Sequence, residues 1–226
     1  MNAIVFGATG LVGQGVLREC LRAPDVEHVL IIGRTASGVQ HPKLRGIVRQ
    51  DLWNYADLEP ELSGFGACFF CLGASSAGMK PEQYEHITYD LTVAAAETLV
   101  RLNPSMTFVY VSGAGTDSSE TGKSMWARVR GKTENALLRM PFKAAYMFRL
   151  SIMRPLDGAR SKTRSYQVFY SLAKPLLPLI HKLVPNYVFT TEEIGQAMLT
   201  LSRSAYPKHV LETRDIRAVL NQSRAR

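Results

Sequence analysis

Apolar and polar positions alternate along the chain with two different periods. Short stretches rich in residues that favour strands, most of them apolar, span residues 2–6, 28–32, 45–49, 67–71, 106–111 and 143–150. Continuous runs of this length are typical of parallel strands that are buried on both faces of a sheet. Between them apolar residues recur at helical spacing, so we expect helices from residue 12 to about residue 23, over 81–102 and over 124–140.

This alternation predicts an α/β fold: a Rossmann-type, doubly wound, mostly parallel sheet with helices on both faces. The pattern is less regular after residue 150. Residues 190–193 look like a capping box that opens a helix to about residue 202, and 209–212 is a candidate last strand. Because the chain shows no repeat and no linker, we expect one domain over residues 1–226, with 157–188 as a substrate-side lid or an interface segment.

The glycines directly after the first strand carry the strongest chemical signal. Gly7, Gly10 and Gly13 stand between a strand and a helix, which is the context that a dinucleotide-binding fingerprint requires, although the GxxGxxG spacing is a variant and any glycine-rich turn is the alternative. Gly7 allows a tight turn, Gly10 leaves room for a pyrophosphate, and Gly13 lets the helix pack close to the strand. The helix N-terminus offers N–H groups to the phosphates. The same turn is expected to place Thr9, Leu11 and Val12 against the cofactor.

The end of the second strand indicates which dinucleotide fits. An NAD-specific site usually has a carboxylate here, which binds the ribose 2′-hydroxyl. This chain has Arg34 instead, and a guanidinium suits the dianionic 2′-phosphate of NADP. The alternative is a solvated loop residue. We therefore expect NADP(H) as the cofactor in preference to NAD.

Two later strand ends supply further candidates. Asp51 and Leu52 follow the third strand, where Asp51 can hold the adenine amino group and Leu52 can cover the adenine face; a simple turn aspartate explains the pair equally well. Leu72, Gly73 and Ala74 follow the fourth strand and let a ligand lie close to the backbone. The rule that ligands bind where the strand order reverses places this strand end beside the cofactor.

Composition narrows the class of partner. The net charge of +8 suits an anionic ligand, and the basic residues are scattered with no base-reading module, so we expect a small-molecule substrate and no nucleic acid. Cys20, Cys68 and Cys71 are too few for a disulfide framework. The CxxC pair lies in an apolar run without a second pair of ligands, so we expect reduced thiols and no metal site.

The sequence also bears on location. Met1 leads straight into the first strand without a signal peptide, and no apolar stretch is long enough to span a bilayer, so a cytoplasmic protein is expected. Residues 166–184 are aromatic and basic, which suits either peripheral membrane attachment or a helix pair that caps the substrate pocket or packs in a homodimer. Pro175 and Pro178 interrupt a continuous amphipathic helix and favour the helix pair.

Taken together, these motifs resemble the short-chain dehydrogenase/reductase superfamily over most of the chain. The residues that carry the resemblance are GATGLVG at 7–13, Gly33-Arg34, Asp51-Leu52, CLG at 71–73, Val111-Ser112 and the helix at 126–138. More narrowly, the chain is similar to the atypical members grouped with the Tat-interacting protein and to NAD-dependent epimerase/dehydratase-like proteins. The resemblance implies hydride exchange between the nicotinamide and a small carbonyl or hydroxyl substrate, with Ser112 at the superfamily's serine position.

The resemblance breaks at the expected catalytic helix, where the superfamily has a Tyr and a Lys four residues apart. The best register places Trp126 at the Tyr position and Arg130 at the Lys position; the other register uses Lys132 as the lysine and places Arg128 at the Tyr. An indole N–H donates a hydrogen bond but does not transfer a proton at any useful pH. Arg130 can hold ribose hydroxyls, yet it keeps its own proton.

Two functions are compatible with an intact phosphate-binding turn beside an incomplete catalytic pair. The first is an NADP-dependent oxidoreductase or epimerase-like enzyme with Ser112, Trp126 and Arg130 at its centre and a non-standard proton donor. The second is a binding protein that holds NADP(H) without turning it over, as a redox sensor or an interaction scaffold. Side chains in segments able to supply a substitute acid are Tyr84, His86, Tyr89, Lys123 and Tyr166.

Overall fold

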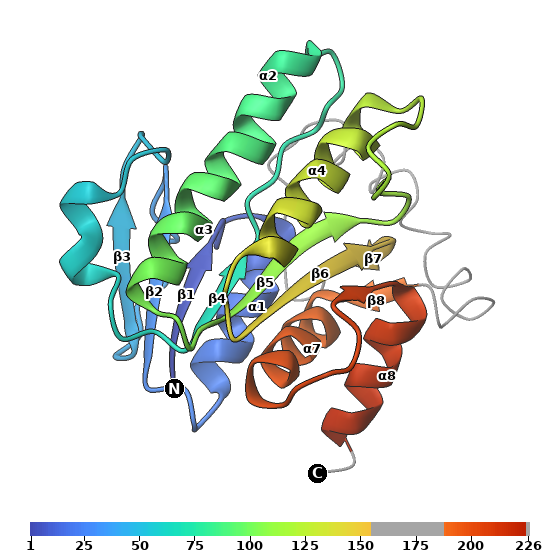
Figure 1. Cartoon of the computed structure of the whole chain (residues 1–226). Coiled ribbons are helices and arrows are strands. Elements are labelled where there is room, and N and C mark those ends of the chain that lie inside the picture. The colour runs from blue at the N-terminus through green and yellow to red at the C-terminus, as the bar shows by residue number, and fades with distance from the viewer. Residues whose placement is uncertain (155–187, 225–226) are drawn as a thin grey trace.

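Within the residues that the structure describes, 1–154 and 188–224, a seven-stranded parallel sheet forms the centre of the molecule (Figure 1). The structure is a computed structural model. The strands are β1 (Asn2–Phe6), β2 (His28–Gly33), β3 (Leu44–Val48), β4 (Ala67–Phe70), β5 (Thr107–Gly113), β6 (Ala144–Leu150) and β9 (Val210–Leu211). Their spatial order is β3-β2-β1-β4-β5-β6-β9, and every pairing is parallel. The predicted Rossmann-type fold is confirmed.

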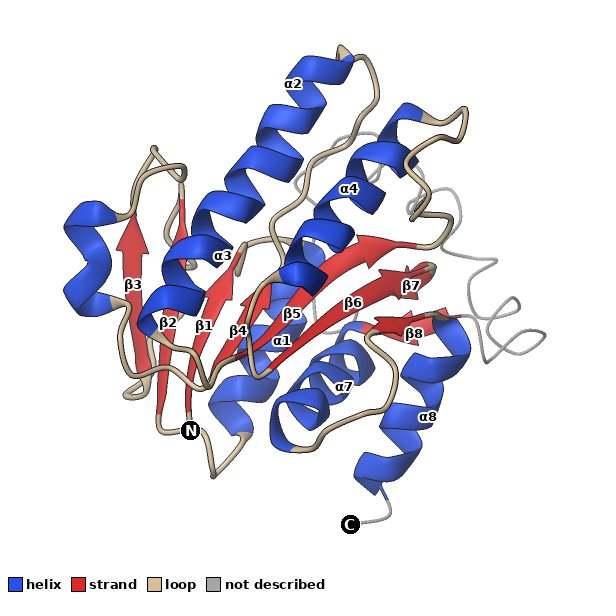
Figure 2. Cartoon of the chain, in the orientation of Figure 1, coloured by secondary structure: helices blue, strands red, loops and turns tan. Residues whose placement is uncertain are grey.

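Helices cover both faces of this sheet (Figure 2). On one face lie α1 (Leu11–Arg22), α7 (Thr191–Arg203) and α8 (Thr213–Arg224). On the other lie α3 (Leu91–Leu102), α4 (Met125–Arg139) and the short 3₁₀ helix η1 (Ala56–Glu61). The strand order reverses between β1 and β4, because β2 and β3 lie on one side of β1 and β4, β5 and β6 on the other. A ligand site is therefore expected at the carboxyl ends of β1 and β4.

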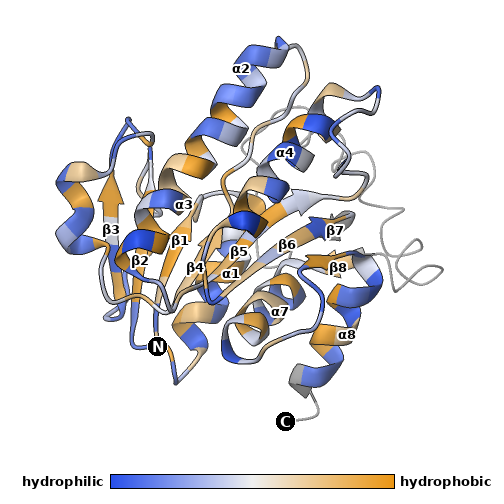
Figure 3. Cartoon of the chain, in the orientation of Figure 1, coloured by the Kyte–Doolittle hydropathy of each residue, from blue (hydrophilic) through white to orange (hydrophobic). Residues whose placement is uncertain are grey.

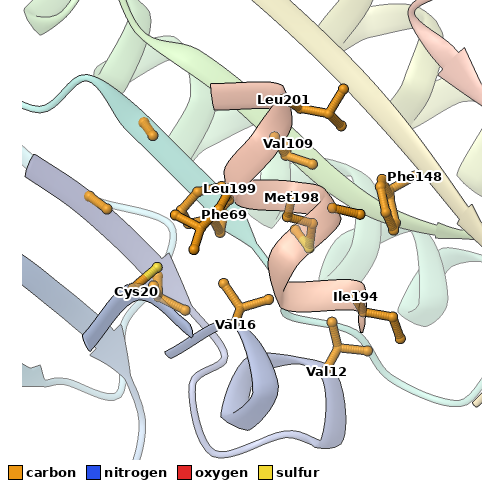
Figure 4. Packing of buried hydrophobic residues seen from close by; sticks show 14 of the residues in the cluster. Val12, Val16, Cys20, Phe69, Val109, Phe148, Ile194, Met198, Leu199 and Leu201 are labelled. Atoms are coloured by element: carbon orange, nitrogen blue, oxygen red, sulfur yellow. The ribbon is translucent and has the colours of Figure 1, made fainter. Parts of the chain in front are cut away.

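Two hydrophobic cores hold these layers together. Successive residues of each central strand point to opposite faces, so Phe69 and Val109 pack with Val16 and Met198 on the α1–α7 face (Figure 4). On the other face the rings of Phe6, Phe70 and Phe108 follow one another, with centroids 5.0 and 5.9 Å apart. Full burial of each such side chain is worth about 1.5–3 kcal/mol. In Figure 3 the central strands are largely hydrophobic, whereas the helices carry both hydrophobic and hydrophilic residues.

The helix predicted over residues 81–102 exists, but it is not uniform. It consists of α2 (Pro81–Glu85), the π-helical turn η2 (His86–Asp90) and α3, which follow one another without a break. A π turn adds one residue to a helical turn, and such insertions are frequent at functional sites. One extra residue rotates the preceding helix by roughly 100° about its axis. The π turn thus decides which face α2 presents to α4.

Elements in the last third of the chain differ most from expectation. The capping box at Thr190 and Glu193 is confirmed, because the Thr190 hydroxyl accepts from the Glu193 N–H at 3.1 Å and the Glu193 carboxylate accepts from the Thr190 N–H at 3.0 Å. A small second sheet, in which β7 (Ile152–Arg154) pairs with β8 (Val188–Thr190), was not predicted. Helix α8 was not predicted either. The segments expected as a lid (157–188) and as a membrane-facing stretch (166–184) fall almost wholly outside the described residues. Among those described, no helix has the length and apolar character needed to cross a bilayer.

Candidate functional site

The turn between β1 and α1 brings three backbone segments unusually close together. Gly7 has φ +73°, a left-handed conformation that glycine adopts freely, and a Cβ there would lie 2.7 Å from the Cys71 carbonyl oxygen. A Cβ on Gly13 would lie 2.1 Å from the Gly7 carbonyl oxygen. The first turn of α1 therefore rests directly on the loop, and the tight turn and the close approach predicted for Gly7 and Gly13 are present.

The N-terminus of α1 is left open for an anion. Gly10 is the N-cap, provides no side-chain cap, and uses its own N–H on the Gly7 carbonyl at 2.9 Å. The helical pattern gives the N–H groups of Leu11, Val12 and Gly13 no acceptor within the helix. The first turn contains no acidic residue. These donors and the positive end of the helix dipole together suit a phosphate group.

A cavity of about 680 Å³ extends from this turn across the carboxyl ends of β1, β2 and β3. Its lining includes Gly7 and Thr9 from the turn and the loop from Gly33 through Arg34 to Gln40. Arg34 is exposed, and the Gln50 side chain donates to its carbonyl oxygen at 3.2 Å. In the described part of the chain the Arg34 guanidinium has no carboxylate partner, so its charge remains available to a ligand.

Asp51 and Leu52 stand apart from this cavity, because neither belongs to its lining. The Asp51 carboxylate accepts from the backbone N–H groups of Trp53 at 2.8 Å and Asn54 at 3.3 Å, which is a turn-forming role. Leu52 is only 1% exposed and packs in the core with Tyr55, whose hydroxyl donates to the Leu52 carbonyl. The geometry favours the turn alternative for Asp51, and a buried Leu52 side chain is not free to cover an adenine. Contact of these two residues with adenine stays a prediction that the structure does not support.

A second cavity, of about 420 Å³, lies at the carboxyl ends of β4, β5 and β6. Leu72 lines both cavities and so marks where they meet. The second cavity brings together Ser112, Trp126 and Arg130, the three residues expected at the catalytic centre, although Ser112 lies far from the other two in the chain. Its lining includes Leu72, Gly73 and Ala74 after β4, Ser112 in β5, and Trp126 and Arg130 on α4.

Ser112 sits in a short chain of hydroxyl groups. Its Oγ lies 3.0 Å from Thr116 Oγ1, and the Thr116 hydroxyl donates its single proton to the Gly113 carbonyl at 2.7 Å. Ser112 must therefore be the donor to Thr116. The Ser112 oxygen is left with lone pairs, so in this arrangement it can accept a hydrogen bond from a ligand hydroxyl.

Arg130 is held by two contacts at the base of this cavity. Its Nη1 donates to the Val111 carbonyl at 3.2 Å, and its Nε donates to the Tyr84 hydroxyl at 3.1 Å. Arg130 lines this cavity and Lys132 does not, which favours the register that places Arg130 at the superfamily's Lys position. Lys132 points elsewhere, toward the ring of Tyr89 and the Glu85 carboxylate.

Trp126 forms an apolar wall of the same cavity. A Cβ on Gly113 would lie 3.6 Å from its ring, and one on Gly115 would lie 3.7 Å from it, so the indole covers the glycine-rich loop after β5. A phenol at this position would bring a hydroxyl to the site, whereas the indole brings ring carbons and one N–H. Trp126 therefore brings no side chain that can transfer a proton into this cavity.

Arg149 and Cys68 belong to the framework, whereas Cys71 is half-buried and lines the smaller cavity. Arg149 bonds the buried Glu134 carboxylate through Nε at 3.1 Å and Nη2 at 2.6 Å, which ties β6 to α4 and turns the guanidinium away from the cavity. Leu150 and Ser151 do line the cavity. Cys68 and Cys71 are free thiols, and burial raises the pKa of both well above the ordinary value. They stay protonated at neutral pH.

The chain is a Rossmann-type α/β protein with two adjoining cavities at the switch point of its sheet, and solved structures share this fold. A UDP-glucuronic acid 4-epimerase from Bacillus cereus in complex with NAD superposes with a TM-score of 0.69 at 13% identity, over 100% of this chain and 85% of that one. DesIV, a dTDP-glucose 4,6-dehydratase from Streptomyces venezuelae with NAD and TYD bound, gives 0.68 at 16% identity, over 100% and 81%. At these identities the likeness shows the fold.

Several curated proteins of similar sequence carry the name FMP52. "Protein FMP52-2, mitochondrial" from Scheffersomyces stipitis is 26% identical over 219 residues, which covers 93% of this chain and 91% of that protein. "Protein FMP52, mitochondrial" from Saccharomyces cerevisiae is 28% identical over 167 residues, covering 73% and 69%. No family model matches the chain. The cytoplasmic location expected from the sequence is contradicted, because these relatives are named mitochondrial; a first strand that starts at residue 2 was not sufficient evidence of location.

Proposed function

We propose that this protein binds NADP(H) and acts as an oxidoreductase or epimerase-like enzyme of the short-chain type on a small carbonyl or hydroxyl substrate. The observation that carries the proposal is the pair of adjoining cavities along the strand ends. One lies beside an open helix N-terminus, and the other collects Ser112, Trp126 and Arg130. Structures that share the fold are described in complex with NAD, which supports a nicotinamide dinucleotide as the ligand class.

The chain's own residues fit such a ligand. The Gly7–Gly13 turn leaves no side chain between the backbone and a pyrophosphate, and the N–H groups of residues 11–13 are free to bind it. Leu72 joins the two cavities, so one extended ligand can occupy both. When bound, the dinucleotide supplies or takes up hydride. The residues of the smaller cavity hold the substrate oxygen and must move its proton.

Arg34 supports NADP(H) rather than NAD(H). The loop after β2 contains no carboxylate between Gly33 and Gln40, so nothing there repels a 2′-phosphate. A charge-assisted bond from a guanidinium to a phosphate contributes about 1.5–3 kcal/mol. That free energy corresponds to a preference of roughly 10- to 100-fold for NADPH over NADH.

The test is a fluorescence titration of the protein with NADPH and NADH in parallel. The chain has two tryptophans, and Trp126 lines the smaller cavity, so energy transfer from indole to the reduced nicotinamide reports binding. We expect Arg34→Ala to weaken NADPH binding roughly 10- to 100-fold and to leave NADH within about twofold. Arg45→Ala is the matched control: it removes the same charge from a residue that pairs with Glu61 outside the cavity. Equal affinities of the wild type for NADPH and NADH would show that Arg34 does not select NADPH. Binding of neither dinucleotide would contradict the proposed function.

A second function is supported by one specific observation, the indole of Trp126 at the position where the superfamily has its proton donor. A protein that binds NADP(H) without turnover would serve as a redox sensor or an interaction scaffold. The two functions separate on one measurement, the consumption of NADPH with small aldehydes and ketones. Binding without consumption favours the second.

A further inference from the structure

Tyr84 is a buried phenol in the wall of the smaller cavity. It lies on α2, is 1% exposed, and lines the same cavity as Ser112 and Arg130. The π turn η2 begins two residues later and sets the face that α2 turns toward α4. The sequence gives no direct sign of this contact, because Tyr84 and Arg130 are 46 residues apart.

The hydrogen bonds around Tyr84 leave its proton uncommitted. The phenol oxygen accepts from Arg130 Nε at 3.1 Å. Among the described residues no acceptor for the Tyr84 hydroxyl proton is present. A buried donor without an acceptor costs about 1–3 kcal/mol, so native structures normally give such a group a partner. Because Tyr84 forms part of the cavity wall, a ligand oxygen in that cavity can be the partner.

We propose that Tyr84 is the catalytic acid of this site and takes the place of the tyrosine that α4 lacks. Arg130 is its positioning residue, since it fixes the phenol oxygen and keeps a positive charge beside it. This inference rests on the proposed function and adds the group that moves the proton. A tyrosine from one helix and an arginine from another together provide what the superfamily takes from a single helix.

Other candidate acids are placed elsewhere. His86 is exposed, bonds Asp90 at 2.9 Å and stacks on Trp53. Tyr89 lies against Lys132 and is absent from the cavity lining. Tyr110 is buried within β5 and is likewise absent from that lining, and desolvation raises its pKa to about 12. Lys123 is exposed on the loop before α4, and Tyr166 lies outside the described residues.

Reduction of a carbonyl to an alcohol requires one hydride at carbon and one proton at oxygen. A bound reduced dinucleotide would supply the hydride for the carbonyl carbon and would be oxidised in doing so. The former C=O π pair becomes a lone pair on oxygen and forms a new O–H bond with the Tyr84 proton as the Tyr84 O–H bond breaks. The phenolate that remains is balanced by the Arg130 guanidinium and regains a proton from solvent. Ser112, whose own proton is held by Thr116, accepts from the product hydroxyl.

The experiment compares Tyr84→Phe with Tyr89→Phe, a matched control on the same helical run but outside the cavity. The probe is 4-fluorobenzaldehyde, followed by ¹⁹F NMR: line broadening with NADP⁺ reports binding, and conversion to the alcohol with NADPH reports turnover. We expect Tyr84→Phe to reduce turnover by about 10²- to 10⁴-fold, the usual contribution of a positioned general acid. We expect it to weaken aldehyde binding about three- to tenfold, as the loss of one neutral hydrogen bond implies. Its NADPH affinity should stay within about twofold of the wild type, and Tyr89→Phe should match the wild type throughout.

The possible failures are distinguishable. Retention of wild-type turnover and aldehyde broadening by Tyr84→Phe would overturn the assignment of Tyr84 and leave the proposed function standing. A wild type that binds NADPH but neither reduces nor binds the aldehyde would overturn the proton-transfer role and favour the second function, a protein that binds NADP(H) without turnover. A wild type that binds no NADPH would remove the proposed function and this inference with it.

Discussion

Single residues at the β1–α1 turn decide how closely the helix approaches the strand. Gly13 has no room for a side chain, since a Cβ would lie 2.1 Å from a backbone oxygen that cannot move aside. Gly33 offers the opposite case, because a Cβ there would meet nothing within 4 Å. From the sequence, Gly13 was expected to let the helix pack close to the strand, and Gly33 was given no role of its own. The structure shows that the packing of α1 requires a glycine at position 13, whereas position 33 has room for a side chain.

Substitution at these two positions should have very different costs. We expect Gly13→Ala to lower the free energy of unfolding by at least about 1–3 kcal/mol, because the methyl group forces α1 away from the turn. We expect Gly33→Ala to change it by less than about 0.5 kcal/mol. Urea denaturation of both variants and the wild type gives the comparison. A Gly13→Ala protein as stable as Gly33→Ala would show that the turn is looser than described.

Individual residues of the site differ in how well the sequence alone could predict their roles. Trp126 could be identified as a departure because its spacing from Arg130 is local to one helix. Tyr84 could be named only as one of several candidates, because its contact with Arg130 depends on how two distant helices pack. Leu52 was expected against a ligand and is in the core, since an apolar residue after a strand suits either place. Pairwise geometry, rather than residue type, decides these roles.

At the scale of elements, strands with continuous apolar runs were placed to within about two residues, because burial on both faces leaves little freedom in their sequence. Helix α8 was missed because its composition is strongly polar, and its buried hydrophobic residues among those described are Ile216, Val219 and Leu220. The π turn η2 was also missed. Its sequence is ordinary for a helix, and the inserted residue is specified by packing against neighbouring elements.

The loop between β5 and α4 depends on one ionised side chain. Asp117 Oδ1 accepts from the Ser119 hydroxyl at 2.6 Å and Oδ2 accepts from the Gly122 N–H at 2.7 Å. These bonds, that to Ser119 first, lower the pKa of the Asp117 carboxyl below its usual value. A lowered folded-state pKa means that this carboxylate stabilises the loop above the unfolded pKa, about 3.9, and that the stabilisation is lost as the pH falls through the folded value.

We therefore expect the loop to keep its structure down to about pH 4 and to loosen below it. The Gly122 amide proton in NMR spectra is the direct reporter, since its hydrogen bond to Asp117 disappears on protonation. Asp117→Asn should give the loosened spectrum at neutral pH and remove the acid transition. A Gly122 amide that titrates with an unshifted aspartate midpoint would contradict the lowered pKa.

In the whole molecule, the two adjoining cavities have different proposed roles, one in binding the cofactor and the other in binding the substrate. The larger cavity lies beside the glycine turn and Arg34, where we propose that phosphate and sugar groups bind, and the smaller cavity is the proposed site of the reacting oxygen. The sequence indicated that the glycine turn and Arg34 lie close together, and the structure places Gly7, Thr9 and Arg34 in the lining of one cavity, because a glycine turn followed by an arginine after the next strand is a local pattern. The sequence could not assemble the smaller cavity, whose residues come from β4, β5, α2 and α4.

This division predicts how ligands stabilise the protein against heat. NADPH at about 100 times its dissociation constant should add about 2.7 kcal/mol of stability, which for a chain of this size raises Tm by roughly 5–10 °C. Adenosine 2′,5′-bisphosphate, which lacks the nicotinamide, should also raise Tm if the larger cavity holds the phosphates. Arg34→Ala should reduce both shifts and keep the smaller shift with NADH, whereas Tyr84→Phe should change none of the three. Thermal scans at matched ligand concentrations measure these Tm shifts. If NADPH raises Tm and adenosine 2′,5′-bisphosphate does not, most of the binding free energy comes from the nicotinamide end of the cofactor.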